Sequence, residues 1–351
     1  MRMNFVKYSP ATARTVKLSI GFVALFGLST AASAHVKWFT HTDGRDRPVE
    51  PSALLTPTFG TVFCVALVLV FVGFLLDGWI AKRWPWLLKM GRTTEAFEQR
   101  VIRAGAGAYF IFLSSVGGII LTPELRSTAS WLPVVQFLAA LCLVWRQTCI
   151  VSGAAILVLY GYAVSQYGVF HLVDYVFMLT LALYLASLSL PWSRLAGLRE
   201  RMLSGGLAFS LAWTAIEKFL YPQWTDAVIA THPVIAMGVP MTPVVVIAGF
   251  VEFTLAFYLI TGRGLLRVGG IGYMLIFLYA MSPFGKLDIF GHLIIVAILL
   301  ITVLRGTTSM QDAFFWTKRD AVFNAGWITA VYLASLTFFI AAYYALQLTA
   351  R

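Results

Sequence analysis

Four ionisable side chains in the second half of the chain stand in or beside long apolar runs. Glu252 lies within the run from 241 to 261, and Lys218 lies near the end of the run from 203 to 221. An ionised group inside a bilayer costs a few kcal/mol or more, so such residues usually face the interior of a helix bundle and pair. We expect Glu252 to be a proton acceptor and Lys218 to compensate its charge. A purely structural ion pair is the alternative.

Asp288 and His292 complete this set of four, and their spacing places them on one face of a helix. A carboxylate in that position can orient the imidazole and fix its tautomer. We expect Asp288 to orient His292 for proton transfer. His171 and Asp174 form an i,i+3 counterpart, and two facing pairs could bind a metal ion or relay protons. The alternative is two polar helix N-termini capped by acidic residues.

Three further residues are candidates with less support from their surroundings. Glu217 directly precedes Lys218, so the two point about 100° apart on a helix and cannot both face one partner. With His171 and Asp174, Glu217 is predicted to bind a cofactor. His35 and His41 flank a short aromatic segment and are candidate metal ligands. If the chain is cut after residue 34, the new amine and imidazole of His35 could chelate copper. Exposed loop histidines are the alternative.

The segments that carry these residues are those of a membrane protein. The 351 residues are 60% hydrophobic and 12% charged, with a mean hydropathy of +0.82, whereas a soluble domain is about 25% charged. Apolar runs of about 20 residues match the length that a helix needs to cross a bilayer. We predict an all-α polytopic membrane protein with about 11 transmembrane helices. Those after residue 57 are expected at 58–80, 104–122, 131–146, 148–166, 171–190, 203–221, 241–261, 265–282, 288–305 and 323–348.

The N-terminal segment 1–34 allows two interpretations. A basic region, a short apolar region and the sequence Ala32-Ser33-Ala34 are typical of a cleaved signal peptide, which would leave 10 membrane helices. The same segment could be an uncut first helix. The rest divides into a periplasmic loop (35–57), a helix with a cytoplasmic amphipathic segment (58–103), two four-helix bundles (104–191 and 203–305) and a cytoplasmic loop with a last helix (306–351).

Basic residues predict the orientation of the chain. Lys and Arg gather in alternate loops, and such loops are usually cytoplasmic. We therefore expect a bacterial inner (plasma) membrane protein with its N-terminus cytoplasmic and its C-terminus periplasmic. The net charge of +11 then reflects these loops and anionic headgroups, so the lipid bilayer is the expected partner and nucleic acid is not.

The sequence indicates that the two bundles are copies of one unit. Leu121-Thr122-Pro123 aligns with Leu220-Tyr221-Pro222, and the segment 167–171 aligns with 284–288. In this alignment Glu252 takes the place of Gln136, and Lys218 takes the place of Ile119. Each unit has an even number of helices, so the copies are expected to be parallel.

The segment from Leu203 to Arg305 resembles the DoxX/DoxD-like superfamily of four-helix membrane proteins. The resemblance is carried by Gly206-x-x-Phe209 with Ile216-Glu217-Lys218-Phe219, by Ala248-Gly249-x-x-Glu252-x-x-x-Ala256, and by Phe284-Gly285-x-x-Asp288-x-x-Gly291-His292. It covers about 100 residues, and 104–190 looks like a degenerate copy. The resemblance implies association with membrane redox systems, with quinone as a possible cofactor. Lys218, Glu252, Asp288 and His292 would then line a pocket facing the periplasm.

Three functions remain open from the sequence. The first is a membrane-embedded subunit of a redox or respiratory-type assembly, with quinone as its ligand and other membrane or periplasmic redox subunits as partners. The second is a proton- or metal-ion-linked transporter or channel. The third is a non-catalytic assembly or scaffold protein. A transporter should carry polar residues through both leaflets, whereas the candidates gather toward one side.

Overall fold

The computed structural model describes residues 46–85, 93–190, 196–233, 241–264, 269–305, 309–315 and 319–349. Within these ranges the regular secondary structure is helical, apart from an isolated bridge between Ile119 and Arg126. The helices are α3 (Pro51–Leu54), α4 (Pro57–Arg83), α6 (Glu95–Val116), α7 (Leu132–Leu141), η1 (Arg146–Thr148), α8 (Cys149–Tyr167), α9 (Val169–Leu172), η2 (Val173–Tyr175), α10 (Val176–Ser189), α11 (Ala196–Leu220), α12 (Pro222–Thr231), α13 (Met241–Thr261), α14 (Gly269–Phe284), α15 (Lys286–Gly291), α16 (Leu293–Arg305), α17 (Ser309–Ala313) and α18 (Ala321–Thr349).

Five helical segments of the described chain are long and apolar enough to cross a membrane: Pro57–Arg83, Arg146–Tyr167, Val169–Ser189, Pro243–Thr261 and Ala321–Leu348. The chain is therefore an all-helical membrane protein. The predicted number of 11 membrane helices is larger for two reasons. Some apolar helices, such as α7, are shorter than a full crossing, and the long helices α6 and α11 carry several charged residues. The predicted N-terminal helix or signal at 1–34 lies outside the described residues.

Each span predicted after residue 57 corresponds to one or more helices in the structure, but several bounds were wrong: α6 and α11 begin earlier than predicted, and the span 288–305 is divided between α15 and α16. The span 104–122 ends at Val116, because Gly117 and Gly118 adopt φ of 69° and 67°, a left-handed conformation that ends a helix. The chain then forms a compact loop up to Trp131. The span 131–146 is helical only to Leu141 and continues as turns and the η1 segment.

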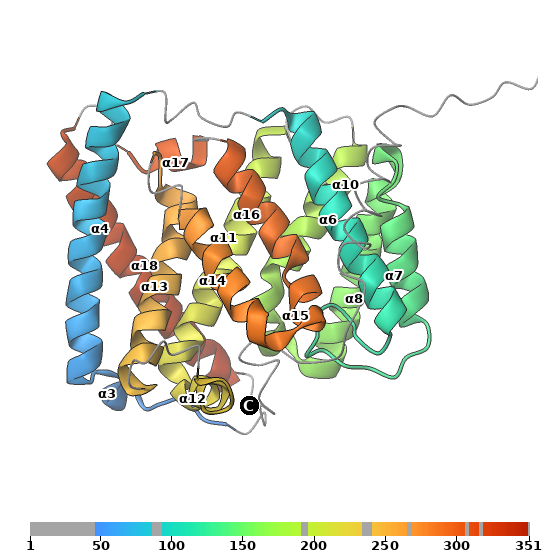
Figure 1. Ribbon diagram of the computed structural model, residues 1–351, viewed down its shortest axis with the longest axis horizontal. Coiled ribbons are helices and arrows are strands. Elements are labelled where there is room, and N and C mark those ends of the chain that lie inside the picture. Colours follow the sequence, from blue (N-terminus) through green and yellow to red (C-terminus); the bar gives the residue numbers. More distant parts are fainter. Residues whose placement is uncertain are drawn as a thin grey trace, which may run out of the picture.

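The helices form two consecutive sets of neighbours (Figure 1). α6, α7, α8 and α10 pack in chain order, and so do α11, α13, α14 and α16. The two sets meet where α10 packs on α11 and α16 packs on α6. Outside the second set, α4 and α18 lie against each other, and α4 also packs on α13. The second set of helices, which carries the four candidate residues, is thus bordered by the first set and by α4 and α18.

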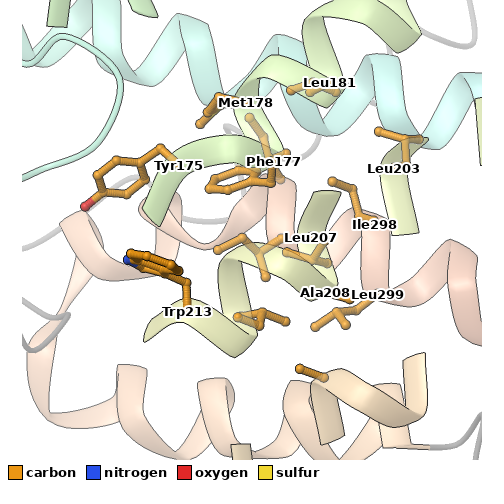
Figure 2. Packing of buried hydrophobic residues seen from close by; sticks show 14 of the residues in the cluster. Tyr175, Phe177, Met178, Leu181, Leu203, Leu207, Ala208, Trp213, Ile298 and Leu299 are labelled. Atoms are coloured by element: carbon orange, nitrogen blue, oxygen red, sulfur yellow. The ribbon is translucent and has the colours of Figure 1, made fainter. Parts of the chain in front are cut away.

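A buried apolar core joins the two sets (Figure 2). Side chains of α10, α11 and α16 meet there, among them Phe177, Leu207 and Leu299, all at most 3% exposed. Polar contacts are few in this region. One of them is the backbone N–H of Phe177, which donates to Ser210 Oγ at 3.0 Å and so ties the start of α10 to α11. Burial of this apolar surface holds the two sets together as one body.

The two ends of the bundle differ in charge. The end where α4 and α16 finish and α6 begins, at the top of Figure 1, is called the basic end here. Two ion pairs cross it: the buried pair of Arg305 and Glu98 at 2.5 Å, and the pair of buried Arg199 with exposed Glu95 at 2.9 Å. Arg103 also donates to the carbonyl of Leu143 at 2.7 Å. Basic side chains therefore bind acidic residues of α6 and carbonyl groups near helix C-termini, where the macrodipole favours cations.

The opposite end carries a covering segment from the start of the described chain. The N–H of Val49 donates to the carbonyl of Leu220 at 2.8 Å, and the Tyr344 hydroxyl donates to the carbonyl of Val49 at 2.6 Å. Trp224 Nε1 donates to Asp46 Oδ2 at 2.7 Å. Residues 46–54 thus tie the ends of α11, α12 and α18 together next to the candidate site.

Candidate functional site

Lys218 and Glu252 form an ion pair between α11 and α13. Lys218 Nζ lies 2.8 Å from Glu252 Oε2, and the two side chains are 11% and 17% exposed. This is the pairing that the sequence predicted, and the distance falls inside the range of about 4–6 Å within which a cation stabilises a carboxylate. Two charges in apolar surroundings are thereby held as one neutral unit.

A glycine allows α11 and α13 to come this close. A Cβ added to Gly249 would lie 2.4 Å from a ring carbon of Phe219, so a larger residue there would force the ring to move. Gly249 precedes Glu252 by one helical turn, and Phe219 follows Lys218 directly. On the other side of Phe219, the ring of Phe59 from α4 makes an edge contact at 5.3 Å. The ion pair therefore has a tightly packed aromatic wall beside it.

Asp288 and His292 form the second predicted pair. Gly285, with φ of 78°, starts α15, which brings Asp288 into the first turn of this short helix and His292 to its end. His292 Nδ1 lies 3.0 Å from Asp288 Oδ1 and also 3.0 Å from the backbone oxygen of Asp288. The two side chains are 4% and 0% exposed. Among the described residues, neither carboxyl oxygen of Asp288 has a well-aligned hydrogen-bond donor. The contact with His292 is therefore chiefly electrostatic.

Aromatic side chains of α14 link the two pairs. The Tyr273 hydroxyl donates to the backbone oxygen of Glu252. Its ring stacks on Phe277 at 5.6 Å, and Phe277 lies 4.6 Å from the imidazole of His292. All four predicted residues thus belong to one region of the second set of helices, with planar apolar rings between the pairs.

Glu217 faces away from this region. The Tyr343 hydroxyl of α18 donates to Glu217 Oε1 at 3.0 Å, while Lys218 faces Glu252. The prediction that adjacent Glu217 and Lys218 serve different partners is confirmed. Asp174 is 3% exposed and within electrostatic range of Tyr343, so it lies near Glu217. These two carboxylates belong to the junction of the two sets of helices and α18.

The partner expected for His171 was wrong. Its Nε2 lies 2.7 Å from Glu124 Oε1, and its ring stacks on Tyr167 at 5.5 Å. Glu124 comes from the loop after α6, which the sequence had assigned partly to a helix. A metal site made of the His171 and His292 pairs gains no support, because the described residues contain no group of three His, Cys, Asp or Glu that could hold a metal ion. His35 and His41, the candidate copper ligands, lie outside the described residues.

Sequence reasoning missed three residues, Glu124, Tyr273 and Asp226. Glu124 lies in an irregular loop, where the sequence has no period that could predict its position. Tyr273 could not be distinguished from other aromatic residues of an apolar helix. Asp226 of α12 lies outside the membrane-spanning helices, and burial raises the pKa of its carboxyl. A predicted short helix after Pro222 would have placed Asp226 at this end of the bundle.

Comparison with known proteins adds no relative: no protein family, curated protein or solved structure matches this chain. The resemblance to DoxX/DoxD-like proteins therefore stays a prediction that rests on the short motifs alone.

Proposed function

We propose that this protein is a membrane-embedded subunit of a redox or respiratory-type assembly that binds a quinone beside its two titratable pairs. One observation carries the proposal: Lys218–Glu252 and Asp288–His292 lie in one region and are joined by the rings of Tyr273 and Phe277. A quinone needs a planar apolar contact for its ring and groups that exchange protons with its oxygens. This region supplies both.

Each group has a distinct role in this proposal. Glu252 accepts a proton, and Lys218 compensates the charge of Glu252 when it is ionised. His292 exchanges a proton with the ligand, and Asp288 orients the ring of His292. The ring of Phe277, 4.6 Å from the imidazole, provides the kind of surface on which a flat headgroup stacks.

The polar groups along α16 favour a one-sided site over a route through the membrane. Between His292 and Thr302 the helix consists of nine apolar residues, 293–301, which span about 14 Å at 1.5 Å per residue. Most of them are buried. Beyond them come the Ser204–Thr302 contact and the Arg305–Glu98 pair of the basic end. A proton or ion that moved along α16 would have to cross these nine residues, which favours a one-sided site over the transporter alternative.

We further propose that the two sets of helices are tandem copies, as the sequence alignment implies. Two observations support this. Gln136 Nε2 donates to the carbonyl of Ile119 at 2.6 Å, so the aligned positions of Glu252 and Lys218 are also in contact in the first set. Gly168 and Gly285, which align, both have positive φ and each starts a short helix. In this proposal the first copy has lost the charged pair.

The test of the quinone proposal uses the full chain purified in nanodiscs, with wild type compared with Glu252→Gln and His292→Ala. Binding of a short-tailed benzoquinone is measured by quenching of tryptophan fluorescence, together with membrane abundance. Glu98→Gln is the matched control, because Glu98 is also a glutamate of a buried ion pair but lies at the basic end. We expect the folded fraction of both site variants to lose binding, and the folded fraction of Glu98→Gln to bind normally.

Other outcomes decide against the proposal. If wild type binds no benzoquinone, the quinone function is wrong. If Glu252→Gln and His292→Ala lose abundance to the same degree as Glu98→Gln, and the folded remainder still binds, both pairs are structural. That result would favour the alternative of a non-catalytic assembly or scaffold protein.

A further inference from the structure

At the basic end of the bundle, α4 ends beside the start of α18 (Figure 1). The two helices are in contact there, because a Cβ added to Gly78 of α4 would lie 4.0 Å from the Cβ of Ala321, the first residue of α18. Lys82 follows Gly78 by one helical turn and so lies on the same face of α4. Arg319 precedes Ala321 by two residues. Both basic side chains are exposed and belong to this junction.

Below the basic residues, each helix exposes apolar side chains. On α4 they form a stripe in which every third or fourth residue is exposed, namely Val65, Leu69, Val72, Leu76 and Trp79. Exposed Arg83 continues the same stripe at the end of the helix. On α18 the guanidinium carbon of Arg319 lies 5.0 Å from the centroid of the Phe323 ring, and Phe323 is 43% exposed. The surface therefore changes from charged to apolar along both helices.

The positive charge at this junction is not neutralised by the acidic residues around it. Within the described ranges, no acidic side chain forms an ion pair with Lys82, Arg83 or Arg319. The two nearest carboxylates in the sequence have other contacts. Asp77 is buried and accepts from backbone N–H groups after α13, and Asp320 caps the start of α18. Three cations thus stand against one exposed carboxylate.

We infer that this junction binds an anionic phospholipid, with the headgroup phosphate at Lys82, Arg83 and Arg319 and the acyl chains along the apolar faces of α4 and α18. Arginine binds phosphate oxygens through two parallel N–H groups, and lysine adds a point charge. Trp79 and Trp84 lie in edge contact at 5.5 Å, and tryptophan favours the headgroup level of a membrane. A zwitterionic lipid fits less well, because its ammonium group is repelled by the three cations. This inference goes beyond the proposed function, and neither depends on the other.

The experiment titrates the full chain in detergent with phosphatidylglycerol and with phosphatidylcholine of the same acyl chains. Native mass spectrometry measures the bound lipid. We expect phosphatidylglycerol to bind about tenfold more tightly than phosphatidylcholine, and Lys82→Gln with Arg319→Gln to remove most of this preference. Arg47→Gln with Arg126→Gln is the matched control, because these two exposed arginines lie at the opposite end of the bundle. The control should keep the preference.

Other outcomes overturn the inference. If the two lipids bind equally well, the junction does not recognise charge. If both double variants lose the same affinity, the attraction belongs to the positive protein as a whole and not to this junction. If soluble glycerol phosphate binds as tightly as the lipid, the apolar faces contribute nothing and the occupant is not a lipid. Should the double variant not fold, a photoactivatable phosphatidylglycerol on wild type decides the question: crosslinks are expected within 79–84 and 319–327, and crosslinks only elsewhere contradict the site.

Discussion

Lys218 and Glu252 are a pair whose energy depends on both members being present. Each loses hydration on entering the bundle, and the 2.8 Å contact offsets that loss only while the partner remains. We predict that Lys218→Met destabilises the protein by about 3–5 kcal/mol, because it leaves a buried carboxylate without its cation. Adding Glu252→Leu should recover most of this loss. Thermal unfolding of the wild type and of these two variants in detergent measures it, and equal losses in the single and double variants would contradict the prediction.

Tyr343 offers a second test at the scale of a single atom. Its hydroxyl donates to Glu217 Oε1 at 3.0 Å, and the whole side chain is buried. A hydrogen bond to a charged group contributes about 1.5–3 kcal/mol, so Tyr343→Phe should lower the unfolding temperature clearly. Tyr332→Phe is the control, because its hydroxyl bonds to the neutral hydroxyl of Thr254 at 3.0 Å and the expected loss is smaller. A larger loss in the control than in Tyr343→Phe would show that Glu217 does not depend on this donor.

At the scale of helices, α8 contains two glycines with different surroundings. A Cβ at Gly153 would lie 2.5 Å from the carbonyl oxygen of Ala182 and 3.2 Å from the Cβ of Ala186, so α8 and α10 would have to separate. A Cβ at Gly161 meets nothing within 4 Å. We predict that Gly153→Ala destabilises by about 1–3 kcal/mol, whereas Gly161→Ala is neutral or slightly stabilising. Unfolding temperatures of the two variants check this, and similar values for both would refute the close packing of α8 on α10.

How far the sequence predicted these elements depended on the kind of signal. The helix at 241–261 has the predicted bounds, because its apolar run is long and Glu252 is the one charged residue within it. The span 104–122 failed at its end, where Gly117 and Gly118 change the backbone direction, and hydropathy does not report backbone conformation. The spacing of Asp288 and His292 predicted their contact. Glu124 could not be paired with His171 in advance, because 47 residues separate them and the loop between α6 and α7 has no period.

At the scale of the whole molecule, the count of Lys and Arg predicted the basic end of the bundle. It did not predict the partners that these side chains bind there. Arg199 and Arg305 were counted as basic residues of loops, yet they bind Glu95 and Glu98 across the two sets of helices. Such pairs are invisible to a count of basic residues, because their acidic partners lie about 100 to 200 positions away. Nine apolar residues of α16, 293–301, lie between the Arg305–Glu98 pair and His292. In the proposed function, the site would therefore exchange protons with only one side of the membrane.

The side of the membrane that the proposed site faces follows from the proposed orientation of the chain. That orientation can be tested by asking on which side positions 92 and 232 lie. Of the helices between these positions, α6, α7, α8, α10 and α11 are the five proposed to cross the membrane, and an odd number of crossings puts 92 and 232 on opposite sides. α7 is the critical one, because its 10 residues span only about 15 Å of a core about 30 Å thick. The turns and η1 that follow must complete its crossing.

We predict that a cysteine at position 232 reacts with an impermeant maleimide added to intact cells, and that one at position 92 reacts only after permeabilisation. Cys64, Cys142 and Cys149 are replaced by serine in both variants, and the cysteine-free parent is the control. In the proposed orientation the basic end, where α6 begins, is cytoplasmic, which would leave Lys218, Glu252 and His292 toward the outer side. Labelling of 92 but not of 232 in intact cells would reverse the orientation. Equal labelling of both would mean that α7 and the following turns do not cross, and that the number of membrane passages between the two positions is even.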